Sequence, residues 1–143
     1  MKKVKEIYRT ISTKPTVVPR NMHIREIVKM LLEDPITRSV YVVDNGRIVG
    51  IITVLHLLKI SGYRFFGIFP KPENVLKDLG VITAKTAEEV MMKPLWVTPE
   101  TPISDALKMM VDNDVQELPV VDETGKIIGD LSSLEVLNAL WRE

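Results

Sequence analysis

An internal repeat is the sequence feature that most constrains the fold. Residues 118–137 contain two short apolar runs around a glycine-containing turn, followed directly by a helix, and residues 40–53 show the same series. Two apolar runs around such a turn predict a β-hairpin. When the two copies are aligned, their helix stops, turns and helix starts coincide: Pro15 with Pro94, Gly46 with Gly125, Gly50 with Gly129 and Thr53 with Ser132. The chain is therefore expected to contain two copies of one structural unit.

Each copy reads helix–strand–helix–strand–strand–helix along the chain. The strands are almost continuously apolar, which is typical of strands that are covered on both faces. One unit alone cannot bury such a sheet, so the two copies should pack against each other. The units are expected to span residues 3–60 and 84–142, joined by an aromatic-rich linker over residues 61–83.

Local signals predict where the helices begin and end. Thr86 with Glu89, and Ser132 with Glu135, have the spacing of a capping box, in which two side chains pair with the free backbone N–H groups of a helix start. The other expected boundaries are a helix over residues 3–11, helix caps at Asn21, Thr53 and Thr101, a helix end near Ile60, and a short strand over residues 95–97.

Composition excludes several classes of function. Lys+Arg and Asp+Glu both number 19, so no net charge would attract nucleic acid or an acidic membrane surface. With no run of about 18 apolar residues and no signal peptide, we expect a cytoplasmic protein without a membrane span. The chain has no cysteine, and its two histidines lack the HExxH spacing, so no metal site is expected. No P-loop, GxGxxG or Ser/His/Asp arrangement predicts an enzyme.

Both copies resemble the CBS domain, which occurs in pairs called Bateman modules. The second copy carries the family's strand motif at residues 119–122 and its strand-to-helix motif at residues 129–135, and the first copy carries them at 41–44 and 50–56. The resemblance covers nearly the whole chain outside the linker. It implies an α+β fold of two βαββα repeats, packed sheet to sheet with pseudo-twofold symmetry, with a cleft beside each hairpin.

The resemblance also implies a regulatory function without catalysis. CBS-domain pairs bind adenosine-containing ligands, including AMP, ADP, ATP and S-adenosylmethionine, usually to regulate another protein or domain. They commonly form homodimers. The chain is therefore expected to require no cofactor, to bind an adenine nucleotide as a regulatory ligand, and to act on an effector protein that the sequence does not name.

A nucleotide site needs an apolar slot for the base, an acceptor for the ribose hydroxyls, and a helix start with donors for phosphate. By the resemblance, the better site lies in the second copy and comprises Leu95, Trp96, Val97, Pro119, Val120, Ser132, Ser133 and Glu135. The weaker site lies in the first copy and comprises Thr16, Val17, Val18, Arg38, Val40, Tyr41, Thr53 and His56. Arg38 or Lys126 would add positive charge.

The position that accepts ribose hydroxyls in the family departs from its usual aspartate in both copies. Glu135 keeps a carboxylate in the second copy, whereas His56 in the first copy offers one acceptor nitrogen when neutral and none when charged. Tyr41 replaces the usual proline, and its ring is expected to crowd the base slot. We therefore expect the second copy to bind ligand better than the first.

Structural explanations stay open for the same residues. Ser132 and Glu135 fit a capping box that needs no ligand, His56 suits an ordinary helix surface, and Trp96 suits the core as well as a slot wall. The aromatic segment over residues 63–72 fits an exposed patch for a dimer mate or partner, or a hydrophobic lid on the chain itself. The alternative function is a protein-interaction scaffold whose clefts no longer bind nucleotide.

Overall fold

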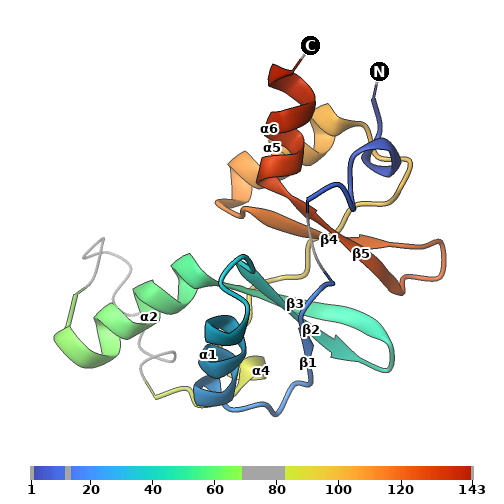
Figure 1. Ribbon diagram of the computed structural model, residues 1–143. Helices are drawn as coiled ribbons and strands as arrows, with labels where there is room; N and C mark the ends of the chain where they lie inside the picture. The colour runs from blue at the N-terminus through green and yellow to red at the C-terminus, as the bar shows by residue number, and fades with distance from the viewer. Residues whose placement is uncertain (1, 12–13, 69–82, 143) are drawn as a thin grey trace.

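The computed structural model describes residues 2–11, 14–68 and 83–142, and shows two halves that each combine helices with a small sheet (Figure 1). The first sheet has the order β1–β2–β3, and the second consists of β4 and β5. β1 runs parallel to β2, and both hairpins are antiparallel. The strands are β1 (Val17–Val18), β2 (Ser39–Asp44), β3 (Arg47–Thr53), β4 (Glu117–Val121) and β5 (Ile127–Ser132). The structure confirms the predicted α+β fold of two packed repeats.

The first hairpin closes with a two-residue turn, and both hairpins contain a shift in their pairing register. Asn45 and Gly46 both have positive φ, at 52° and 77°, which is the backbone of the type I′ turn that best fits the twist of a two-residue hairpin loop. The pairing register shifts between Val42 and Val43 in the first hairpin and between Val120 and Val121 in the second. The two copies are therefore alike in their strand irregularities as well as in their order of elements.

The helices are η1 (Val4–Glu6, a 3₁₀ turn), α1 (Ile24–Glu33), α2 (Val54–Phe66), α4 (Ala87–Val90), α5 (Ile103–Asn113) and α6 (Ser133–Trp141). Capping boxes are present at the starts of α4 and α6, as the sequence predicts. No helix among the described residues combines the length and the apolar character that a membrane crossing requires.

Two predicted helix caps are wrong. α1 is capped by His23 instead of Asn21, because the His23 Nδ1 accepts the N–H of Arg25 at 3.0 Å. α5 begins after Pro102, and the Thr101 hydroxyl is used differently: it accepts the N–H of Thr98 at 2.9 Å and closes the preceding turn.

The first repeat's last helix is longer than predicted. α2 continues through Ser61 and Gly62 to Phe66, and Tyr63 in this additional part of the helix is buried. Gly67 ends the helix in the left-handed conformation at φ 63°, a C-cap geometry that glycine adopts without strain. The helical part of the aromatic segment thus extends to Phe66, while residues 69–82, which include the end of that segment and most of the expected linker, lie outside the described residues.

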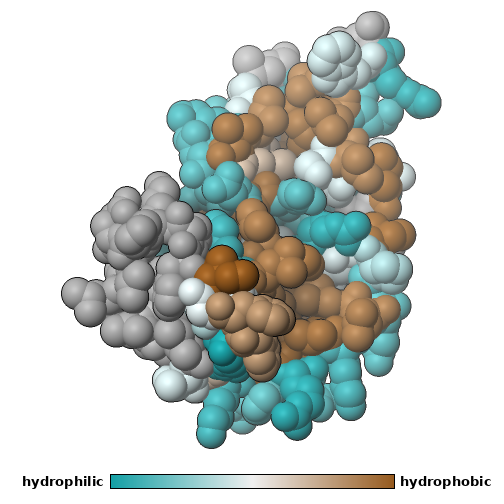
Figure 2. Space-filling model, turned by 90° about the vertical axis from the view of Figure 1, so that its left-hand side faces the viewer, coloured by the Kyte–Doolittle hydropathy of each residue, from teal (hydrophilic) through white to brown (hydrophobic). Residues whose placement is uncertain are grey.

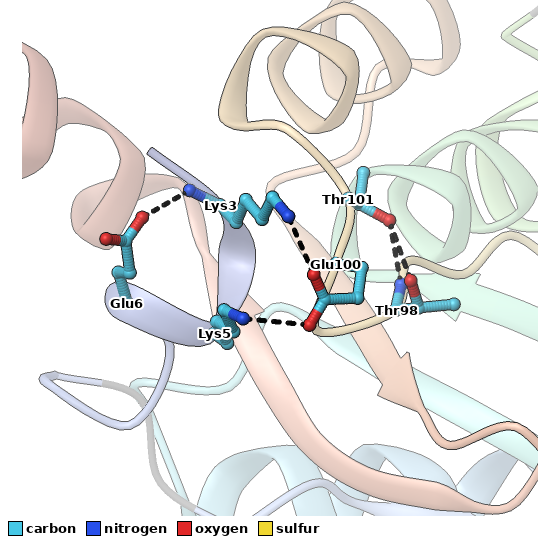
Figure 3. Close-up of polar contacts among 6 residues, drawn as sticks. All are labelled: Lys3, Lys5, Glu6, Thr98, Glu100 and Thr101. Atoms are coloured by element: carbon cyan, nitrogen blue, oxygen red, sulfur yellow. Dashed lines mark hydrogen bonds and ion pairs between the residues drawn. The ribbon is translucent and has the colours of Figure 1, made fainter. Parts of the chain in front are cut away.

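The first helix of each repeat packs on the opposite repeat. η1 lies beside the second repeat, where the Val4 N–H donates to the Thr101 carbonyl and the Lys5 N–H to the Pro99 carbonyl, both at 2.9 Å. Lys3 and Lys5 also form ion pairs with Glu100 (Figure 3). Only a 3₁₀ turn forms where the sequence predicts a helix over residues 3–11, because Arg9 adopts a positive φ of 76° and the N–H groups of Thr10 and Ile11 donate to Glu135 of the second repeat.

In the same way, the first helix of the second repeat packs on the first repeat. α4 follows the linker in sequence but lies beside α1 (Figure 1), where the Ala87 N–H donates to the Met22 carbonyl at 2.8 Å and the Ile24 N–H donates to the Lys85 carbonyl at 2.9 Å. Met92 forms an antiparallel bridge with Ile51 of β3. The predicted strand over residues 95–97 is reduced to one parallel bridge between Val97 and Val120.

Two hydrophobic cores result, and each mixes residues from both parts of the chain. The core of the second half includes Val4 and Ile7 of the N-terminal segment together with Leu131 of β5. The core of the first half includes Val90 of α4 together with Ile52 of β3. Because each repeat supplies a helix to the other core, neither can complete its packing without its partner.

Candidate functional site

Two cavities lie next to each other where the two repeats meet. The α6 cavity, of about 360 Å³, is lined by Pro35, Ile36, Arg38, Gln116, Glu117, Ser132, Ser133 and Leu134. The α2 cavity, of about 240 Å³, is lined by Arg38, Thr53, Val54, Leu55, Leu58, Asp114 and Gln116. Arg38 and Gln116 line both cavities, so the two spaces share a polar wall.

The pseudo-twofold symmetry explains this arrangement. Arg38 directly precedes β2 and Gln116 directly precedes β4, so they occupy equivalent positions in the two repeats. Thr53 and Ser132 are the N-caps of α2 and α6, which are equivalent helices. Each cavity therefore combines the N-terminus of one repeat's last helix with a polar residue from the other repeat.

A helix N-terminus favours an anion because its first N–H groups have no partner within the helix. Here several of these groups are already bound. The Ser133 N–H donates to the Gln116 carbonyl at 2.8 Å, and the Leu134 N–H donates to the Ser132 hydroxyl at 3.0 Å. Side chains, and above all the Arg38 guanidinium, must therefore supply most of the attraction for an anionic group.

Arg38 lines both cavities, so its guanidinium can attract an anionic group in either of them. Its guanidinium donates to the carbonyl oxygens of Pro35 and Thr37, which fixes the side chain over the loop before β2. Ser132, Ser133 and Arg38, assigned by sequence to different sites, meet around the α6 cavity. Thr53 lies across the shared wall in the α2 cavity.

Glu135 has a structural role in this geometry. It is 1% exposed, and its Oε1 accepts the Ser132 N–H at 2.9 Å within the capping box. Its Oε2 accepts the N–H groups of Thr10 and Ile11, at 2.8 and 3.0 Å, and the Thr10 hydroxyl at 3.1 Å. The carboxylate thus holds the segment that follows η1 against the second repeat.

His56 occupies the equivalent position in the first repeat and has an equivalent role. Its Nε2 lies 2.7 Å from the carbonyl oxygen of Val90, at the end of α4. The ring thereby joins α2 of the first repeat to α4 of the second repeat, as Glu135 joins α6 to the segment that follows η1. The family resemblance assigns both positions to ribose recognition. In this structure each of them contacts the opposite repeat instead, near that repeat's first helix.

The residues expected to form the base slots are dispersed. In the second copy Val97 is buried beside β4, Pro119 and Val120 are buried within β4, and Leu95 is half-buried against the core. Trp96 is 47% exposed and lines a separate cavity with Arg47 and Asp122, at the hairpin end opposite Ser132. In the first copy Val18, Val40 and Tyr41 are buried, Val17 is exposed, and the Thr16 carbonyl accepts the Tyr41 N–H.

Two acidic residues near the site were missed by sequence reasoning. Glu117 and Asp130 are buried in β4 and β5, and a charged residue inside an apolar strand run was the available signal. Glu117 accepts the N–H groups of Arg38 and Ser39, and Asp130 accepts the hydroxyl of Tyr41. Burial, followed by the neighbouring Glu117, raises the pKa of Asp130 to about 9. Burial likewise raises the pKa of Tyr41.

Solved structures share this architecture, and a curated relative matches the sequence over most of its length. A CBS domain-containing protein from Thermotoga maritima is 50% identical, with a TM-score of 0.88 over 99% of this chain and 96% of that chain. CBSX2 of Arabidopsis thaliana, solved in complex with AMP, is 24% identical, with a TM-score of 0.78 over 99% of this chain and 98% of its own. An uncharacterized protein from Methanocaldococcus jannaschii, MJ1426, is 25% identical over 94% of this chain and 90% of that protein.

The family comparison gives the same result for each repeat separately. The model of the CBS domain matches residues 4–63 and again residues 87–142, which are the two copies recognised by their hairpins and helix caps. Together the matches cover more than half of the chain. The protein therefore belongs to the CBS domain family and carries its domain as a tandem pair.

Proposed function

We propose that the protein is a regulatory, non-catalytic module that binds an adenosine-containing ligand in the α6 cavity and more weakly in the α2 cavity. The observation that carries this proposal is the convergence of Arg38, Ser132 and Ser133 on a space of about 360 Å³, within the size range of small-molecule sites. Two structural neighbours support the ligand class: CBSX2 was solved with AMP, and the CBS domain pair of MJ0100 with 5′-methylthioadenosine and S-adenosyl-L-methionine.

The charge of the shared wall favours a phosphate-bearing ligand. A guanidinium binds phosphate oxygens in a planar, two-pronged geometry and stays charged at all relevant pH values. S-adenosylmethionine brings a sulfonium cation, which Arg38 would repel. We therefore expect AMP, ADP or ATP to bind more tightly than S-adenosylmethionine.

Thermal melting tests this proposal. A ligand present at 100 times its dissociation constant should stabilise the fold by about 2.7 kcal/mol, so AMP, ADP or ATP should raise the melting midpoint. Arg38→Gln should weaken binding by about tenfold or more, because it removes the charge from the phosphate side of both cavities.

Arg47→Gln is the matched control, because Arg47 lines the separate cavity beside Trp96. It should leave the ligand-induced shift unchanged. If Arg47→Gln abolishes the shift and Arg38→Gln does not, the ligand binds beside Trp96 and the assignment to the α6 cavity is wrong. If no adenosine compound moves the midpoint, the scaffold function is favoured.

The same module should form a homodimer through an apolar face. Figure 2 shows apolar surface gathered over both halves on the side where α2 lies. Exposed apolar residues occupy equivalent positions in the two repeats: Leu32 and Val111, Leu55 and Leu134, and Leu58 and Leu137. In a closed dimer, each subunit contributes the same surface patch to the interface. Because this apolar face has equivalent residues in the two repeats, it can pack against the same face of a second subunit.

The double substitution Leu58→Glu and Leu137→Glu should therefore convert the dimer to a monomer, measured by sedimentation velocity. Burying two carboxylates on each subunit without partners would oppose association. Phe66→Glu, in the exposed aromatic segment, should leave the dimer intact. Dissociation by Phe66→Glu alone would move the interface to the aromatic segment.

A further inference from the structure

A buried polar cluster crosses from one repeat to the other. Tyr41 lies in β2, Glu117 in β4 and Asp130 in β5, and their exposures are 0%, 5% and 4%. The Tyr41 hydroxyl donates to Asp130, and Glu117 lies beside Asp130 on the same face of the second hairpin, two residues before Pro119, the cross-strand partner of Asp130. Glu117 Oε1 in turn accepts the N–H groups of Arg38 and Ser39. Donors of the first repeat thus form hydrogen bonds with both acids of the second repeat.

This arrangement requires a proton. Two buried carboxyl groups side by side on one face of a hairpin are not both ionised, because like charges repel strongly where water is excluded. The titratable groups that face Asp130 are Tyr41 on β2, Glu117 on β4 and Glu135 on α6, and all three are acidic. Burial and Glu117 raise the pKa of Asp130 to about 9. At neutral pH Asp130 therefore carries a proton, and the neighbouring Glu117 accepts the two N–H groups of the first repeat.

The cluster is an addition to the repeat fold, which does not itself need the two acids. Tyr41 pairs with Ile51 in the first hairpin, and at the equivalent point of the second hairpin Pro119 pairs with Asp130. Ser39 is the counterpart of Glu117, since both are the first residue of their strand. The acids occur on one side of the pseudo-twofold axis only, where they reach the N–H group of the residue that lines both cavities.

We propose that Tyr41, Asp130 and Glu117 form a proton-dependent latch that fixes Arg38 and the start of β2 to the second repeat. While Asp130 holds its proton, Glu117 can bind the Arg38 and Ser39 N–H groups. Loss of the proton places a negative charge on Asp130 beside Glu117 and loosens the contact between the repeats that lines both cavities. The latch consists of this chain's own residues, so its test requires no nucleotide.

Carboxyl ¹³C NMR of aspartate-labelled protein tests the latch directly. One aspartate carboxyl should stay protonated at neutral pH and titrate near pH 9, and its signal should be absent from Asp130→Asn. The amide signals of Arg38 and Ser39 should shift with the same midpoint, which ordinary packing of Asp130 would not produce. Asp130→Asn should abolish this shift, because its amide keeps a donor for Glu117 and an acceptor for Tyr41 at every pH.

Two further variants complete the experiment. Glu117→Gln should lower the Asp130 midpoint by about one pH unit or more, since it removes the neighbouring charge and offers a donor instead. Asp122→Asn, in the exposed turn of the second hairpin, should leave every signal of the latch unchanged. The latch is refuted if all aspartates titrate in the usual acidic range, or if Asp130 titrates while the Arg38 and Ser39 amides do not respond.

Discussion

Glu135→Ala is expected to lower the free energy of unfolding by about 3 kcal/mol or more. The carboxylate caps α6 through the Ser132 N–H and also binds the N–H groups of Thr10 and Ile11. Alanine would leave the buried Ser132 N–H and the part-buried N–H groups of Thr10 and Ile11 without their acceptor, and each unsatisfied buried group costs about 1–3 kcal/mol. The measurement is urea unfolding followed by circular dichroism, with the midpoint and slope compared with those of the parent protein.

Glu89→Ala provides the matched control. Glu89 occupies the same position of a capping box, at the start of α4, but its carboxylate bonds are exposed and local, to the N–H groups of Lys85 and Thr86 and to the Thr86 hydroxyl. Its loss should cost about 1 kcal/mol, as for an ordinary helix cap. Equal losses from Glu135→Ala and Glu89→Ala would show that the long-range contacts of Glu135 contribute nothing.

This experiment also decides how binding data on Glu135 should be interpreted. Because the carboxylate holds the segment after η1, a loss of nucleotide affinity in Glu135→Ala would follow from a displaced segment as readily as from a lost ribose contact. His56→Ala offers the comparison in the first repeat, where the ring meets the Val90 carbonyl. Binding should therefore be measured only under conditions where each variant is shown to be folded.

The second large effect is expected from Gly129→Ala. A Cβ atom at this position would lie 2.5 Å from Cε2 of Tyr8, so the ring that follows η1 must move away from β5. Overpacking of this kind typically costs about 1–3 kcal/mol. The expected result is a lower unfolding midpoint together with weaker docking of the N-terminal segment, observed as faster proteolysis of residues 2–11.

A double-mutant cycle separates this contact from a general effect of alanine in a strand. If Tyr8 causes the strain, Gly129→Ala combined with Tyr8→Ala should cost less than the sum of the two single changes. Gly62→Ala is the control, because a Cβ there would lie at an ordinary 3.6 Å from Cβ of Ile68, and alanine at this position of α2 favours the helix. Additive costs in the cycle would mean that Tyr8 does not pack against Gly129.

The sequence alone determined the features that depend on neighbouring residues. The two hairpins follow from apolar runs around glycine turns, and the capping boxes of Thr86 with Glu89 and Ser132 with Glu135 are present as predicted. The alignment of the two copies and the CBS resemblance were therefore available without coordinates. Each of these signals lies within a few residues along the chain, which is the range over which helix and turn energetics act.

Only the tertiary structure decided which repeat each first helix joins and what the polar side chains bind. Glu135 accepts N–H groups from Thr10 and Ile11, and Asp130 meets Tyr41, although these partners are remote in sequence. Trp96 and Ser132 belong to the same repeat yet line different cavities. Local patterns identify buried positions but not the group that a buried carboxyl will face, because that group is set by packing between segments far apart in the chain.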